Sequence, residues 1–87
     1  MKLLFCPECN DIKKMKYSKK TFCNCRKSWG MYTEDGLNAI IGGRTIPIGI
    51  DNHSFIKAIK NQPEEGLGYR FDAFVIPKNC PTINRLD

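Results

Sequence analysis

The chain contains a single histidine, His53, and it has no carboxylate pair at suggestive spacing, no nucleophile elbow and no phosphate-loop motif. Most catalytic sites are assembled from such groups. Because nothing pairs His53 in sequence with a nucleophile, we interpret it as a surface residue near a helix start. The sequence therefore favours a binding protein over an enzyme.

Long hydrophobic runs are missing as well. No segment approaches the roughly 20 apolar residues that span a bilayer. The apolar stretch at residues 3–5 is also shorter than the roughly 7–15 residues of a signal-peptide core. Heptads, internal repeats and low-complexity tracts are absent. We expect a cytoplasmic protein without a membrane segment, in a compartment where thiols stay reduced.

The small size of the chain limits its core. A chain of 87 residues is expected to form one domain. Chains this short bury a limited share of their surface, so many recruit a metal or disulfides. Five cysteines would leave one unpaired in a disulfide framework. In a reducing compartment, metal ligation explains the thiols better.

Four of the five cysteines lie in the first third of the chain, in the motifs Cys6-Pro7-Glu8-Cys9 and Cys23-Asn24-Cys25. Two short pairs separated by a small spacer have the spacing of a tetrahedral thiolate site for Zn²⁺. Four thiolates leave no open coordination position, so we expect the zinc to be structural and not catalytic. The predicted ligands are Cys6, Cys9, Cys23 and Cys25.

The second cysteine pair departs from the usual spacing of metal knuckles. One residue, and not two, separates Cys23 from Cys25, which demands an unusual local backbone. Cys80 or His53 is therefore an alternative fourth ligand.

Positive charge is concentrated in the same segment. Residues 1–30 carry eight basic and two acidic side chains, a net charge of +6, and residues 31–87 carry six basic and seven acidic ones, a net charge of −1. Zinc bound to four thiolates would lower the total from +5 to about +3. Such a charge favours polyanions. The candidate nucleic-acid contacts are Lys13, Lys14, Lys16, Lys19, Lys20, Arg26 and Lys27.

Aromatic residues accompany these cations. The cations could follow phosphates while Phe22, Trp29 and Tyr32 stack on bases. The alternative is a solvated hairpin whose lysines keep the metal module soluble. For Trp29, packing over the zinc or against the second half of the chain is the favoured interpretation.

Short strands are expected around both cysteine pairs, with a turn at residues 18–20. The predicted strands cover residues 3–5, 12–17, 21–23 and 28–33.

A different pattern follows a turn signal at residues 34–36. The apolar runs 37–41 and 44–50 flank Gly42-Gly43, which predicts a β-hairpin with a tight turn. Because Pro47 cannot donate a hydrogen bond to a ladder, its strand is predicted to lie at an edge or to be bulged.

A short helix is predicted over about residues 51–62, with Asp51 or Asn52 as its cap. Farther on, the sequence predicts a core strand over residues 71–76 and gives no strong signal over residues 78–87.

The turn Gly42-Gly43-Arg44 is a second candidate site. Consecutive glycines expose backbone N–H groups and an arginine adds a forked cation, a combination that binds anions. The alternative is an ordinary hairpin turn with a surface arginine.

Residues 3–33, with their two cysteine pairs, resemble zinc ribbons, which implies a metal-stapled hairpin fold. A wider pattern is similar to a group of short bacterial and phage proteins. This second resemblance implies a cytoplasmic protein, in the host cytoplasm if it is phage-encoded. The pattern comprises Cys23-x-Cys25, Lys27-Ser28-Trp29-Gly30-x-Tyr32 and Ala73-Phe74-Val75-Ile76-Pro77-Lys78.

The sequence predicts a small α+β fold in one domain, residues 1–87. A zinc-ribbon module over residues 1–33 is followed by a small β-rich lobe with one short helix, residues 34–87, packed on it. The expected function is non-enzymatic binding of nucleic acid through the basic hairpin. The alternatives are an interaction or inhibitor module that acts on a host protein and a binder of a small anionic nucleotide signal. The oligomeric state is left open.

Overall fold

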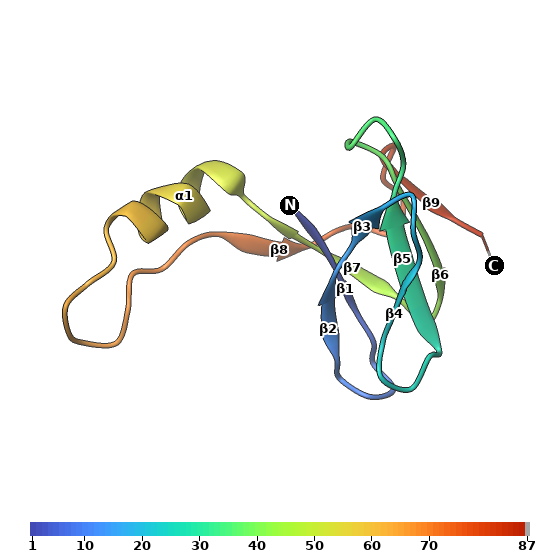
Figure 1. Ribbon diagram of the computed structural model, residues 1–87, viewed down its shortest axis with the longest axis horizontal. Coiled ribbons are helices and arrows are strands. Elements are labelled where there is room, and N and C mark those ends of the chain that lie inside the picture. The colour runs from blue at the N-terminus through green and yellow to red at the C-terminus, as the bar shows by residue number, and fades with distance from the viewer. Residues whose placement is uncertain (87) are drawn as a thin grey trace.

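The computed structural model describes residues 1–86 and contains two β-sheets and one helix (Figure 1). The helix, Asn52–Lys60 (α1), lies outside both sheets. The first sheet has the order Ile12–Lys14 (β2), Lys2–Phe5 (β1), Ile46–Ile50 (β7) and Ala73–Val75 (β8). The second has the order Lys16–Tyr17 (β3), Ser28–Tyr32 (β5), Ala39–Gly43 (β6) and Ile83–Arg85 (β9), with Thr21–Phe22 (β4) also paired to β5. The expected small α+β class with one short helix is confirmed.

The two sheets pack against each other around a small core. Strand β5 alternates between buried and half-buried residues, as expected for a strand with one face on a core. Met15, between β2 and β3, is buried where the chain passes from one sheet to the other. The core cluster consists of Leu4, Cys6, Met15, Cys23, Tyr32, Ala39 and Ile41.

Tyr32 belongs to this core and not to an exposed ring surface. It is buried, its ring stacks on Tyr17 with centroids 5.2 Å apart, and its hydroxyl accepts a hydrogen bond from the Lys2 backbone N–H at 2.6 Å. The expectation that Tyr32 offers a ring for base stacking is therefore wrong.

The turn between β5 and β6 is fixed by one carboxylate. Asp35 accepts hydrogen bonds from the Thr33 hydroxyl at 2.6 Å, the Leu37 N–H at 2.9 Å and the Asn38 N–H at 3.0 Å. These bonds hold the pKa of Asp35 well below its usual range. The turn predicted at residues 34–36 is present.

The predicted hairpin around Gly42-Gly43 is wrong. Strand β6 pairs with β5 and β9, whereas β7 pairs with β1 and β8, so the chain changes sheets at this turn. Gly43 adopts a positive φ of 65°. Thr45 is fully buried, and its hydroxyl contacts the Gly42 carbonyl at 2.8 Å and accepts from the Trp29 N–H at 3.0 Å. These bonds direct the chain into the opposite sheet.

The edge position predicted from Pro47 is also wrong, because β7 is an interior strand. The Pro47 carbonyl accepts a hydrogen bond from the Ile76 N–H at 3.0 Å, just beyond the last β7–β8 register pair, Ile48 with Val75. The N–H and C=O of one strand residue point to the same side, so the missing donor faces the end of the β8 ladder. The proline therefore ends this pairing without placing β7 at an edge.

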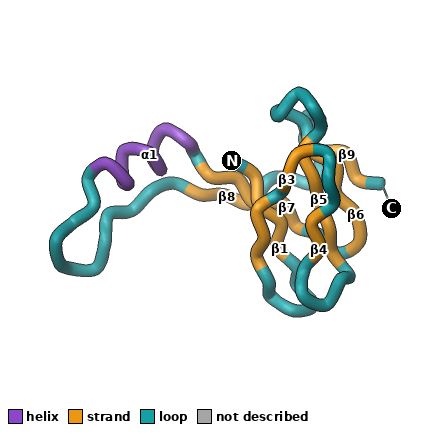
Figure 2. Tube along the Cα trace, viewed as in Figure 1, coloured by secondary structure: helices purple, strands orange, loops and turns teal. Residues whose placement is uncertain are grey.

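Residues 51–75 form an arm that is joined to the first sheet by β8 and otherwise projects from the sheets (Figure 2). Asp51 caps α1 by accepting from the Ser54 N–H at 3.2 Å, as the sequence predicted. Phe55 and Phe71 meet edge to face, with ring centroids 4.9 Å apart. The radius of gyration is 14.1 Å, against about 12 Å for a compact domain of this length. We call residues 51–75 the arm.

The strand predicted within residues 71–76 is present as β8, but it is exposed along its whole length, so its predicted place in the core is wrong. Only Ile76, immediately beyond it, is buried. The tail contains a strand that the sequence did not signal, because β9 pairs in parallel with β6. Asp87 lies outside the described residues. Within residues 1–86, no helix has the length and apolar character needed to cross a membrane.

Candidate metal centre

Two similar turns bring the four N-terminal cysteines together. Cys6 follows β1 and Cys23 follows β4, so each turn begins where a strand ends. The Cys6 carbonyl accepts from the Asn10 N–H at 2.7 Å, and the Cys23 carbonyl accepts from the Arg26 N–H at 3.1 Å. Asn10 and Arg26 both have positive φ angles, of 57° and 64°. Each turn is therefore closed by a bond back to its first cysteine, from the fourth residue on in the first turn and from the third in the second.

The sulfur atoms of Cys6, Cys9, Cys23 and Cys25 all lie within 4.8 Å of one another. The Cys25 Sγ is 3.6 Å from the Cys6 Sγ and 3.5 Å from the Cys23 Sγ. Four sulfurs about 2.3 Å from a tetrahedral metal lie about 3.8 Å apart. All four are free thiols. This donor set and spacing fit a tetrahedral metal, so the group could hold a metal ion.

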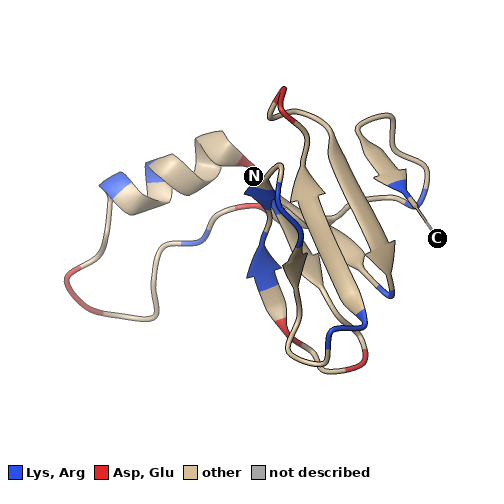
Figure 3. Cartoon of the chain, turned by 45° about the vertical axis from the view of Figure 1, so that its right-hand side comes forward, with Lys and Arg blue, Asp and Glu red and all other residues tan. Residues whose placement is uncertain are grey.

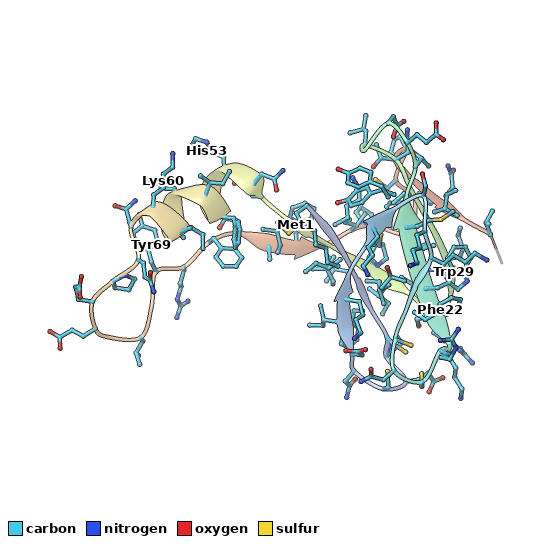
Figure 4. All side chains as sticks on the ribbon, in the orientation of Figure 1. Met1, Phe22, Trp29, His53, Lys60 and Tyr69 are labelled. Carbon is cyan, nitrogen blue, oxygen red and sulfur yellow. The ribbon has the colours of Figure 1, made fainter. Side chains whose placement is uncertain are left out.

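The tight C-x-C spacing does not remove Cys25 from the group. Cys25 is the exposed member, whereas Cys6 and Cys23 are buried in the core. Cys80 lies elsewhere, beside β9, with its Sγ 3.4 Å from the Thr82 hydroxyl. His53 lies in the first turn of α1, on the arm (Figure 4). Neither alternative ligand belongs to the cluster.

The thiols of the cluster ionise unequally. Burial disfavours the Cys6 thiolate, but the Ser28 hydroxyl that faces the sulfur and hydrogen bonds from the Cys9 and Glu8 backbone outweigh it and lower the pKa of Cys6 to about 6. A hydrogen bond from the Lys27 backbone favours the Cys25 thiolate, but desolvation and the neighbouring thiols outweigh it and raise the pKa of Cys25 to about 12. Crowded thiolates repel one another, and a bound divalent cation would relieve that repulsion.

Two residues that the sequence did not signal support the cluster. The Asp11 carboxylate accepts from the Asn24 N–H at 3.0 Å, which ties the first cysteine turn to the second. The buried Ser28 hydroxyl has no hydrogen-bond partner at normal distance among residues 1–86, and it faces the Cys6 sulfur. It is placed to donate to that sulfur once it is charged. The only hint in the sequence was their position beside the cysteine motifs.

No protein-family model, curated protein or solved structure matches this chain. The geometry of the cysteine cluster is therefore the main observation that bears on function.

The candidate nucleic-acid contacts are divided between the two sheets and the second cysteine turn (Figure 3). Lys13 is 3.7 Å from the Asp11 carboxylate. The Lys20 ammonium lies over the Trp29 ring, 4.2 Å from its centroid. The exposed cations of the set are Lys14, Lys16, Lys19, Lys20, Arg26 and Lys27.

The candidate anion site at Gly42, Gly43 and Arg44 is engaged with the first and second cysteine turns. The Arg44 Nε is 3.5 Å from the Glu8 carboxylate, and the Arg44 backbone N–H donates to the Lys27 carbonyl at 3.0 Å. Anion binding here stays a prediction.

Proposed function

We propose that the chain is a non-enzymatic zinc-ribbon protein that binds nucleic acid through its basic segment, residues 13–20, and the adjoining second cysteine turn. The sequence predicted this segment as part of a hairpin, but β2 and β3 belong to different sheets; the name basic hairpin is kept here for residues 13–20 alone. Four thiolates with tetrahedral spacing are the donor set that Zn²⁺ takes in closed structural sites. A closed site has no coordination position for a substrate, so the metal would hold the fold and take no part in chemistry.

The support for nucleic acid is the placement of cations around the metal centre. The basic hairpin and the turn that carries Arg26 and Lys27 flank the same cysteine cluster, and most of their side chains are exposed. A metal-fixed turn holds such side chains at constant spacing, which lets several of them contact successive phosphates. Contacts of this kind give affinity without sharp sequence readout.

Replacing three exposed lysines of the hairpin is expected to weaken binding uniformly across nucleic-acid sequences. Lys14, Lys16 and Lys19 are exposed, and unlike Lys13 and Lys20 they make no ion pair or ring contact within the described part of the chain. The triple glutamine variant should lower the slope of log K against log salt by about 2 to 3, at roughly 0.7–0.9 per lost phosphate contact. Fluorescence anisotropy with a labelled oligonucleotide at several salt concentrations measures this slope.

The matched control removes the same charge at a distance from the hairpin. Lys57 and Lys60 lie on α1 and Lys78 lies after β8, so replacing these three by glutamine should leave the slope nearly unchanged. Equal losses in both triple variants would indicate a net-charge effect, and salt-independent binding would contradict the proposal.

A second candidate function is protein interaction through the arm. Leu67 is fully exposed, and Phe74 and Val75 of β8 have exposed fractions of 53% and 66%. Among the strands of residues 1–86, β8 pairs with β7 alone, so its other edge is open to a partner strand. A groove of about 580 Å³ continues from β8 to β9, with Val75, Ile76 and Ile83 in its wall. Apolar surface of this kind is typical of interaction sites.

The arm hypothesis is tested by a double variant, Leu67→Ser with Phe74→Ser. In nuclease-treated bacterial lysate, the wild type and the triple glutamine variant should retain the same specific partner, whereas the serine variant should lose it. Mass spectrometry of the retained proteins provides the measurement. A partner lost on nuclease treatment or with the triple glutamine variant would count against the arm and favour nucleic acid.

A further inference from the structure

We propose that the nucleic acid is single-stranded and that two of its bases stack on Phe22 and Trp29. We call these two residues the ring pair. This inference rests on the proposed function and specifies the form of nucleic acid that it takes.

The ring pair lies on the outer face of the second sheet. Phe22 and Trp29 are direct cross-strand partners of β4 and β5, so their side chains project from the same face. Ser28, Gly30 and Tyr32 are the buried residues of β5, and the alternation places Trp29 on the opposite side. Figure 4 shows both rings on the side of the molecule away from the arm.

The Trp29 ring occupies the space beside Gly42 that a side chain at that position would fill. Gly42 is the partner of Trp29 on β6, and a Cβ there would lie 2.3 Å from the indole Nε1. The indole therefore packs directly on the Gly42 backbone. A fixed ring on a sheet is a stacking platform that costs little conformational entropy on binding.

A cationic side chain from a neighbouring turn lies over each ring. The Lys20 ammonium lies 4.2 Å from the Trp29 centroid, and the Arg26 guanidinium carbon lies 4.4 Å from the Phe22 centroid. Both cations are exposed and on long side chains. A base that stacks on either ring would displace the cation above it, which could then pair with the adjoining phosphate.

This arrangement favours single strands over duplexes. In a duplex the base faces are stacked on one another and cannot reach a ring on a sheet, whereas the unstacked bases of a single strand can. The cations alone would not discriminate between the two forms, because both present phosphates. The ring pair therefore supplies a preference that the basic hairpin does not.

The test uses Trp29 as a reporter, because it is the only tryptophan of the chain. The zinc-loaded full chain is titrated with a single-stranded oligothymidylate and with a blunt duplex of the same length. Tryptophan emission and the anisotropy of a labelled strand are recorded together. We expect the single strand to quench Trp29 in parallel with binding, and the duplex to bind more weakly without quenching.

Phe22→Leu keeps an apolar contact for Trp29 and removes the ring. It is expected to lower affinity for the single strand on the order of tenfold, as for loss of one stacked base. Tyr69→Leu removes an exposed ring on the arm and should leave affinity unchanged. Lys20→Gln should retain the quenching and lower the salt slope by about 0.7.

The outcomes separate the two proposals. Absence of any oligonucleotide binding would overturn both the proposed function and this inference. Salt-dependent binding with unchanged Trp29 emission, or with equal affinity for the duplex, would overturn stacking and leave the proposed function in place. Because the emission test uses the unaltered chain, this conclusion stands even if Phe22→Leu fails to fold.

Discussion

Removal of the metal, which we propose is zinc, with a strong chelator under reducing conditions is expected to abolish the cooperative thermal unfolding of the chain. Cys6 and Cys23 are part of the core cluster, which contains seven buried residues within the described range 1–86. Structural zinc contributes apparent binding energies on the order of 10–16 kcal/mol in zinc-finger peptides. That is as large as the total stability of a typical domain, about 5–15 kcal/mol. Circular dichroism during heating, with metal analysis of the same sample, measures the loss.

The cysteine variants provide the matched comparison. Cys6→Ser removes a buried ligand at the end of β1 and should lose both the metal and the folded state. Cys80→Ser changes the remaining cysteine, outside the cluster, and should keep one equivalent of zinc and the wild-type transition. The metal centre would be refuted by purified protein that holds no stoichiometric zinc and whose melting is unaffected by chelator.

Local signals in the sequence were sufficient for the cysteine turns and for several elements. The paired cysteines predicted a cluster that the structure brings within ligand distance, including Cys25 with its unusual spacing. The strand over residues 28–33 appears as β5, Ser28–Tyr32, and the cap at Asp51 is present. In each case the deciding residues are close together in the chain, so their chemistry can be interpreted without the rest of the fold.

Long-range pairing explains the errors. Two apolar runs around Gly42-Gly43 are typical of a hairpin, but β7 finds its partner in β1, where Leu4 pairs with Pro47. The apolar run Ala73–Val75 has core composition, yet its position on the arm leaves it exposed. Local hydrophobicity does not determine which surface a strand will pack against. The supporting roles of Asp11 and Ser28 could not be predicted from the sequence either, because they depend on contacts across the two turns.

Gly43→Ala is expected to destabilise the fold by about 3 kcal/mol or more. Gly43 has a φ of 65°, a conformation that costs other residues roughly 1–2 kcal/mol. A Cβ at this position would lie 2.0 Å from the Lys27 carbonyl oxygen, which is a backbone atom and cannot rotate away. The same oxygen accepts the hydrogen bond from the Arg44 N–H, so relieving the clash would break the contact between β6 and the second cysteine turn.

The control for Gly43→Ala is Gly68→Ala in the arm. Gly68 also has a positive φ, of 114°, but a Cβ there meets no atom within 4 Å. Its φ lies farther from the left-handed region open to alanine than that of Gly43, so its substitution carries at least as much backbone strain but no clash. A larger loss of stability in Gly43→Ala is therefore attributable to the contact with Lys27. At about 4–8 °C per kcal/mol for a domain of this size, Gly43→Ala should lower the melting temperature of the zinc-loaded protein by more than about 10 °C. Equal melting temperatures for the two variants would show that the turn between the sheets is not closed as described.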